Sequence, residues 1–185
     1  MKNIRLKIEY DGTLYKGWQI QRPTVAHSQP TVQETVANAL CQILQHPITL
    51  IGSGRTDAGV HAKAQYAHFK TTAPCLPAQL QRSLNAILPS DIRIKGARYV
   101  GTLFHSQYSA KSKRYRYSIM NQSYCPVFLR HYVYVLHVPL DVELMRREAA
   151  SLLGRHDFTS FQSQGSAVRD PVRTITKIAV CKKTA

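Results

Sequence analysis

Acidic side chains are scarce in this 185-residue chain: ten Asp and Glu stand against 25 Lys and Arg, a formal net charge of +15. The excess is not a basic tail, because residues 1–103 hold 12 basic and 5 acidic side chains and residues 104–185 hold 13 and 5. A folded chain that is basic throughout indicates a polyanionic partner, most simply nucleic acid. The plain alternative is a basic soluble protein without such a partner.

Cysteine is also infrequent, and the four present (Cys41, Cys75, Cys125 and Cys181) form no Cys-x-x-Cys pair. This pattern predicts free thiols in a reducing cytosol and argues against a disulfide framework or a zinc site. The eight histidines show no metal-ligand spacing, so we expect no metal. No apolar run approaches the length of a membrane span, and the basic residues form no amphipathic helix, so we expect no membrane partner.

Several catalytic signatures are absent as well. The sequence has no Gly-x-Ser-x-Gly elbow, no phosphate-cradling Gly-Lys-Ser/Thr loop and no dinucleotide fingerprint. No pair of nearby carboxylates suggests a two-acid hydrolase. The side chains left for catalysis are single carboxylates, arginines and tyrosines on a basic protein. A reaction that uses only these groups needs no metal or redox cofactor.

The first half shows alternating and helical patterns in a regular order. Residues 4–10 alternate apolar and polar side chains, which predicts a strand with one face on a core. Thr31 and Glu34 form a capping-box pair before apolar residues at helical spacing. Further strands are predicted at 48–51, 64–69 and 92–95, extending towards 100, with a second helix at 78–88. This order is typical of a ferredoxin-like (split βαβ) half over residues 1–103.

The second half, residues 104–185, begins to repeat that order. Strands are predicted at 113–119, 132–136 and 175–181, and a helix at 141–153 with Gly154 as its C′ residue. A second helix and a closing strand are missing. The expected fold is therefore α+β, with two ferredoxin-like halves and antiparallel sheets, the second half incomplete at the C-terminus as if the chain were cut short.

One glycine-rich stretch carries the most chemical information. In residues 52–62, three glycines surround Arg55 and Asp57, which would point the same way in an extended segment, with Thr56 opposite. A guanidinium near Asp57 would keep its carboxylate ionised at neutral pH, as suits a nucleophile or general base. The alternative is a strand-end turn with a surface ion pair. Trp18, the only tryptophan, is either a core anchor or a base-stacking residue.

Residues 54–62, Gly-Arg-Thr-Asp-Ala-Gly-Val-His-Ala, resemble the signature of the tRNA pseudouridine synthase A family. Other blocks resemble family motifs in the same order, so the resemblance runs from about residue 4 to about residue 180. These blocks are Tyr-Asp-Gly at 10–12, Gly-Trp-Gln at 17–19, Thr-Val-Gln-Glu at 31–34, Phe-His at 104–105, Lys-Arg-Tyr-Arg-Tyr at 113–117, Asp-Phe-Thr-Ser-Phe at 157–161 and Arg-Asp-Pro-Val-Arg at 169–173.

The resemblance implies an isomerase that converts uridine to pseudouridine around positions 38–40 of the tRNA anticodon stem-loop, as a cytoplasmic homodimer without a cofactor. It makes Asp57 the nucleophile, Arg55 the residue that helps to flip the base out, and Tyr115 the residue that packs on it. Taken alone, Tyr115 would sooner be read as a core strand tyrosine; the set of motifs favours the base-packing role. Possible RNA contacts are Lys113, Arg114, Arg116, Arg169 and Arg173.

The chain departs from the family pattern in two places. Gln107 stands where an arginine is usual, and a C-terminal block that supplies a further arginine and an apolar wall has no counterpart before Ala185. Two other functions are therefore also considered. One is a catalytically weak or inactive RNA-binding fragment, which would bind RNA without turnover. The other is a small-molecule enzyme on a ferredoxin-like scaffold, against which the charge of +15 argues.

Overall fold

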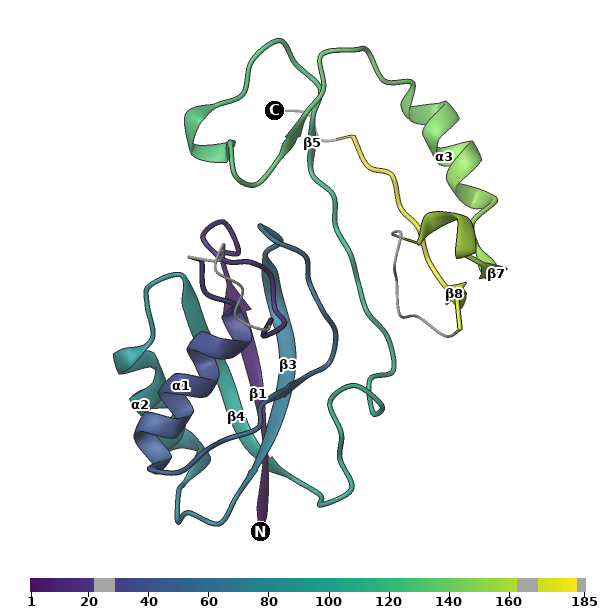
Figure 1. Ribbon diagram of the computed structural model, residues 1–185. Helices are drawn as coiled ribbons and strands as arrows, with labels where there is room; N and C mark the ends of the chain where they lie inside the picture. The colour runs from purple at the N-terminus through teal and green to yellow at the C-terminus, as the bar shows by residue number, and fades with distance from the viewer. Residues whose placement is uncertain (22–28, 163–169, 183–185) are drawn as a thin grey trace. The chain divides into compact units, whose positions relative to one another are not determined.

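The computed structural model describes residues 1–21, 29–162 and 170–182 of the chain (Figure 1). They form two compact units, Met1–Tyr115 (unit 1) and Arg116–Ala185 (unit 2). Each unit is described here by itself. The element pattern of the sequence divides the chain near residue 103, between two expected structural repeats. That boundary is a different one from the division into compact units, and it stays a prediction. In the described ranges, no helix has both the length and the apolarity to cross a membrane.

Unit 1 is an antiparallel four-stranded sheet with two helices. In chain order its elements are β1 (Lys2–Tyr10), α1 (Val32–Leu44), β2 (Ile51–Gly52), β3 (Ala62–Thr71), α2 (Pro77–Ile87) and β4 (Ile92–Val100). The strands lie in the order β2-β3-β1-β4, and α1 and α2 lie side by side on one face (Figure 1). The element order expected from the sequence is confirmed, whereas β2 is shorter than the predicted strand at 48–51.

The predicted capping box at the start of α1 is formed. The Thr31 hydroxyl accepts a hydrogen bond from the Glu34 amide at 3.2 Å, and the Glu34 carboxylate accepts one from the Thr31 amide at 3.5 Å. Such a cap satisfies two backbone donors that the first turn leaves unpaired. The helix ends at Leu44, where Gln45 takes a left-handed conformation with φ of 56°.

The core of unit 1 lies between the sheet and the two helices. Alternation along β1 places Ile4, Leu6 and Ile8 on this face, all with no exposed surface. Trp18 is 1% exposed and belongs to the same cluster, so it is a core residue rather than a base-stacking one. Its place beside the sheet fixes the segment that follows β1.

Unit 2 contains one helix and short strands. Its elements are β5 (Ile119–Met120), a 3-10 helix (Val127–Leu129), β6 (Tyr134–Val135), α3 (Val142–Ala150), β7 (Gly154–Asp157), a 3-10 helix (Thr159–Phe161) and β8 (Val172–Ile175). β5 and β6 pair in parallel, and β7 and β8 pair antiparallel. As a whole the described residues are mixed α and β with three α-helices, and their sheets are antiparallel except for the parallel pair β5–β6, which departs from the antiparallel pairing expected from the sequence.

Two strands predicted for the second half of the sequence, residues 104–185, were wrong. Residues 113–118 have no regular structure, and only Ile119–Met120 is strand; the last strand is Val172–Ile175 rather than 175–181. Alternating side chains form a strand only where a neighbour pairs with the backbone and one face is covered. Residues 113–118 have no pairing strand and are exposed, and no described residue of unit 2 is buried, so the alternating pattern is not enforced by a core.

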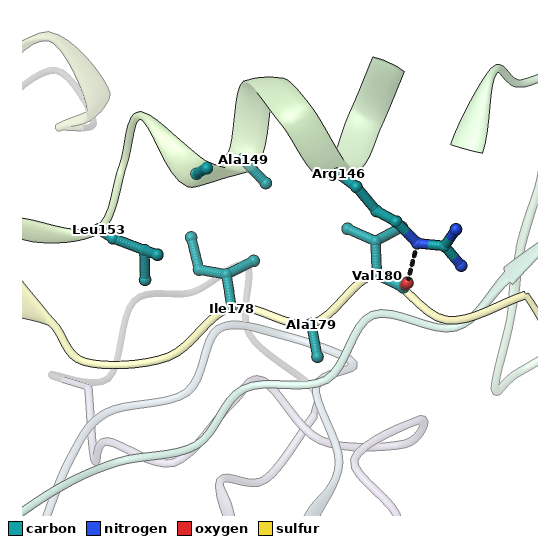
Figure 2. A pocket seen from close by; sticks show the side chains of 7 residues that line it. Arg146, Ala149, Leu153, Ile178, Ala179 and Val180 are labelled. Carbon is teal, nitrogen blue, oxygen red and sulfur yellow. Dashed lines mark hydrogen bonds between the residues drawn. The ribbon is translucent and has the colours of Figure 1, made fainter. Parts of the chain in front are cut away.

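The predicted helix of unit 2 is present but exposed. Asp141 caps α3 by accepting a hydrogen bond from the Leu144 amide at 2.9 Å, and none of the helix residues is buried. Figure 2 shows Leu153 and Ile178 facing each other in a hollow of about 250 Å³ between α3 and residues 178–180. The Arg146 side chain closes one end by donating to the Val180 carbonyl at 2.9 Å. Gly154, with φ of +99°, begins β7.

Candidate active site

The Asp57 loop joins β2 to β3 at the end of the sheet where β1 finishes. The Ser53 amide donates to the Tyr66 carbonyl at 2.7 Å, which extends the hairpin by one more bond. The Ser53 hydroxyl and the Gln65 side-chain carbonyl bond at 2.6 Å, and the Gln65 amide donates to the Gly54 carbonyl at 2.5 Å. Gln65 is 7% exposed. The first turn of the loop is therefore fixed to a buried position of β3.

The other side of the loop is held by the segment that follows β1. The Trp18 amide donates to the Thr56 carbonyl at 3.0 Å, and the Gly59 amide donates to the Tyr15 carbonyl at 3.2 Å. The Tyr10 and Thr56 hydroxyls bond at 2.9 Å. Burial raises the pKa of Tyr10, partly offset by its side-chain hydrogen bonds, so its phenol stays neutral.

Close backbone approach explains two glycines of this segment. A Cβ on Gly12 would lie 2.1 Å from the Val60 carbonyl oxygen, and one on Gly17 would lie 2.3 Å from that of Thr56. Gly17 also has φ of +77°, a conformation that residues with a side chain rarely adopt. The glycines of the Tyr-Asp-Gly and Gly-Trp-Gln blocks therefore allow the first segment to pack directly against the Asp57 loop.

Thr56 is directed inwards, and the residues on either side of it are exposed. Thr56 bonds to buried Tyr10, whereas Arg55 and Asp57 are both exposed. This agrees with the alternation expected from the sequence. The expected ion pair between Arg55 and Asp57 is not formed among the described residues. Hydrogen bonds fix Thr56 in place, and the Arg55 and Asp57 side chains beside it are exposed to solvent. An ion pair between two exposed side chains gains little free energy.

The loop ends at a second polar contact. His61 Nδ1 lies 3.0 Å from the Asp11 carboxylate and 3.1 Å from the Gly12 amide, which donates to it. Asp11 also accepts from the Thr13 amide at 3.0 Å. These contacts fix the turn after β1 to the start of β3. Asp57 is thus an exposed carboxylate on a loop held at both ends and in the middle.

The proposed RNA-contacting residues differ in their placement. Lys113 belongs to unit 1, and its ammonium nitrogen would be 3.0 Å from a Cβ at Gly54, so its side chain lies against the Asp57 loop. Tyr115 is 72% exposed and is not a core tyrosine. Arg114 and Arg116 are exposed. Arg173, in β8 of unit 2, donates to the Asp170 carbonyl at 2.7 Å; Arg169 lies outside the described residues.

Sequence reasoning missed the residues that hold the loop: Tyr10, Gln65, and the pair formed by Asp11 and His61. A signal for Tyr10 existed, because alternation along β1 puts it at the end of the core face, beside the loop. No comparable signal pointed to Gln65, whose contact depends on the register of β3 against β2. Among the residues that the structure describes, no group of three His, Cys, Asp or Glu side chains could hold a metal ion.

A family profile described as tRNA pseudouridine synthase matches residues 7–109 and 149–185, more than half of the chain. A tRNA pseudouridine synthase A of Thermoanaerobacter sp. strain X514 is 40% identical over 182 residues, which cover 98% of this chain and 72% of the relative. The chain belongs to the tRNA pseudouridine synthase family. A tRNA pseudouridine synthase A of Acetivibrio thermocellus is 43% identical, over 97% of this chain and 72% of the relative. A Klebsiella pneumoniae (strain 342) protein of that name is 43% identical, over 97% of this chain and 64% of the relative.

The ranges matched by the family profile include some of the candidate residues and leave out others. The first matched range contains the whole Asp57 loop and the segment that holds it, residues 10–18. Residues 110–148 lie outside the matched ranges, and they include Lys113, Tyr115 and Arg116. For these residues the argument depends on the motif at 113–117 and, for Lys113, on its place beside Gly54.

Proposed function

We propose that this tRNA pseudouridine synthase family member isomerises uridine in tRNA with Asp57 as its nucleophile. The observation that carries the proposal is the exposed Asp57 carboxylate on a loop held by β3 and by residues 10–18. The reaction breaks the bond between N1 and C1′, rotates the uracil, joins C5 to C1′ and releases the proton from C5. A carboxylate that adds to the base or the sugar holds the intermediate through these steps.

The remaining side chains have roles in binding and in base extrusion. Arg55 is exposed two residues before Asp57, where its guanidinium can replace the stacking partner of a departing base. Exposed Tyr115 offers an aromatic face to the extruded uracil, which recovers part of the unstacking cost. The basic residues Lys113, Arg114, Arg116, Arg169 and Arg173 are assigned to phosphate contacts.

The finer assignments belong to the same proposal. The target is the anticodon stem-loop around positions 38–40, the protein is a cytoplasmic homodimer, and the chain consists of two ferredoxin-like halves. The strand order β2-β3-β1-β4 with both helices on one face supports this assignment for the first half. The family match and the charge of +15 support a tRNA substrate.

Tritium release from tRNA labelled at C5 of uridine tests the proposal, because the reaction replaces that C–H bond. The purified chain is expected to release tritium in proportion to time and protein, and only from labelled tRNA. A chain that binds tRNA but releases no tritium above a protein-free control would contradict catalysis.

That second outcome corresponds to the other candidate function, an RNA-binding protein with weak or no turnover. The observation that favours it is that no described residue of unit 2 is buried, so the side chains of this unit are held loosely. Binding without turnover separates the two functions in one pair of measurements.

A further inference from the structure

The sheet of unit 1 has a second face, on the side away from α1 and α2. Part of it is covered, because Asn3 and His68 are each 3% exposed and bond to residues 101–106. The uncovered part is called here the open face. Because side chains alternate along a strand, residues of β1 that flank the buried Ile4, Leu6 and Ile8 lie on it. The register places their neighbours on β3 and β4 on the same face. Basic residues on it come from all three strands and include Arg5 and Lys7 from β1, Lys70 from β3 and Arg98 from β4.

Two of these cations lie directly opposite each other. Arg5 of β1 is the register partner of Arg98 of β4. Like charges opposite each other in an antiparallel pair destabilise the sheet. Burial, together with the neighbouring Arg98 charge, lowers the pKa of Arg5. The repulsion between the two arginines therefore costs folding free energy, and an anion bound between the two guanidinium groups would remove that cost.

No acid of the described residues neutralises this pair. The ion pairs in the described ranges include neither Arg5 nor Arg98 nor Lys7. Glu9, on the same face of β1, is 3.1 Å from Lys95 and so is already paired. Any anion that neutralises the arginines has to come from another molecule or from the remaining segments of the chain.

The arginines border a small hollow and are partly preorganised. The Arg5 guanidinium lies 4.6 Å from the centroid of the Tyr66 ring, a cation–π contact that restricts its side chain. Gly96, opposite Lys7, has no side chain to fill the space, and a Cβ there would meet nothing within 4 Å. The resulting hollow, of about 120 Å³, is lined by Arg5, Lys7, Gly96, Ala97 and Arg98.

We propose that this hollow on the open face binds a phosphate group of the RNA backbone, outside the Asp57 loop. The bidentate geometry of a guanidinium fits phosphate oxygens, and Lys7 and Lys70 on either side suit further phosphates of the same strand. A whole nucleotide is a poorer occupant than a phosphate group, since the hollow has a volume of only about 120 Å³. The site extends the proposed function, on which it rests, from catalysis to substrate positioning.

Its distance from the catalytic loop fits one bound RNA. Arg5 lies five residues before Tyr10 on β1, roughly 17 Å at a rise of 3.3–3.4 Å per residue. Tyr10 is bonded to Thr56, the neighbour of Asp57. At roughly 3.4 Å of helix axis per phosphate of one strand, this span corresponds to about five nucleotides of a stem whose uridine enters the Asp57 loop.

The test measures tRNA affinity against salt for the full 185-residue chain and its variants. The double variant Arg5→Gln, Arg98→Gln is compared with Arg82→Gln, which removes an exposed charge from α2 on the helix side. Each phosphate contact contributes about 0.9 to the slope of log K against log salt. In the double variant the slope is expected to become less steep by roughly 1 to 2, and the affinity for tRNA is expected to fall at least tenfold. Arg82→Gln should change neither, and Arg5→Lys, Arg98→Lys should keep most of the slope.

Thermal unfolding separates binding from folding. Because the substitutions remove a like-charge pair, the double variant should unfold at the wild-type temperature or above it. A slope equal to that of Arg82→Gln would overturn the site. So would a double variant that loses binding to phosphatidylserine vesicles while its tRNA slope is unchanged, or one that loses only the binding of inorganic phosphate. A wild-type chain that neither binds tRNA nor releases tritium would overturn the proposed function itself, whereas normal wild-type binding with an unaffected double variant would overturn the open-face site alone.

Discussion

Gly17 is the residue at which the site tolerates change least, because its φ of +77° and its distance from Thr56 both exclude a side chain. Gly17→Ala should lower the unfolding free energy by about 2 kcal/mol or more and reduce tritium release together with it. Gly101→Ala is the matched control, since a Cβ there meets nothing within 4 Å. Urea unfolding and the tritium assay on both variants check this; equal effects of the two substitutions would contradict the packing described for the loop.

His68 makes unit 1 sensitive to pH. It is 3% exposed and bonds to the Ser106 hydroxyl at 3.1 Å, and burial, with smaller contributions from His105 and Lys70, lowers its pKa. Between the ordinary value near 6.5 and the lowered folded value, the unfolded chain therefore binds more protons than the folded one. Stability should rise with pH across that window and fall as the pH drops below about 6.5.

His68→Gln removes this titration. Thermal unfolding at pH 7.5 and 5.5 should show a larger loss of melting temperature for the wild type than for the variant. His137→Gln, which changes an exposed histidine of unit 2, serves as the control and should behave like the wild type. Parallel losses in the wild type and the His68 variant would contradict the account.

At the scale of the elements, the two capped helices provide a matched comparison. Thr31 caps α1, whose apolar side is buried in the core, whereas Asp141 caps α3, which has no buried residue. Thr31→Ala should lower the unfolding free energy of unit 1 by about 1 kcal/mol, the usual cost of a lost cap. Asp141→Ala should leave the main unfolding transition unchanged. Circular dichroism melts of the two variants check the difference, and an equal shift would mean that α3 is part of the same cooperative core.

The elements that could be predicted from sequence are those whose pattern is enforced by burial. The alternation of β1 and the capping box of α1 agree with the structure because one face of each lies in the core. The predicted strand at 113–119 has an equally clear alternation, but all seven residues are exposed, so neither of its faces lies on a core. The Asp57 loop was recognised from its glycines and its motif. Its fixing by Gln65 was not, because that contact with Ser53 and Gly54 depends on the register of β3 against β2.

At the scale of the whole molecule, the two units differ in how many of their side chains are buried. Buried residues lie in unit 1, and among the described parts of unit 2 there are none. Hydrogen exchange should therefore show slow amides in β1 and β3 and exchange within seconds to minutes in α3 and β8. Mass-spectrometric exchange with peptides from both units checks this. Equal protection of residues 142–150 and 62–71 would contradict it.

The central claim is that Asp57 performs the chemistry while other residues bind the tRNA. Asp57→Asn keeps the shape of the side chain but removes its ability to act as a nucleophile, so tritium release should fall by roughly a thousandfold or more. Affinity for tRNA should stay within about threefold of the wild type, since phosphate contacts supply most of the binding. Asp141→Asn, a substitution that preserves a helix cap in unit 2, should change neither quantity. Release of tritium by Asp57→Asn at a rate within about tenfold of the wild type would show that another group is the nucleophile.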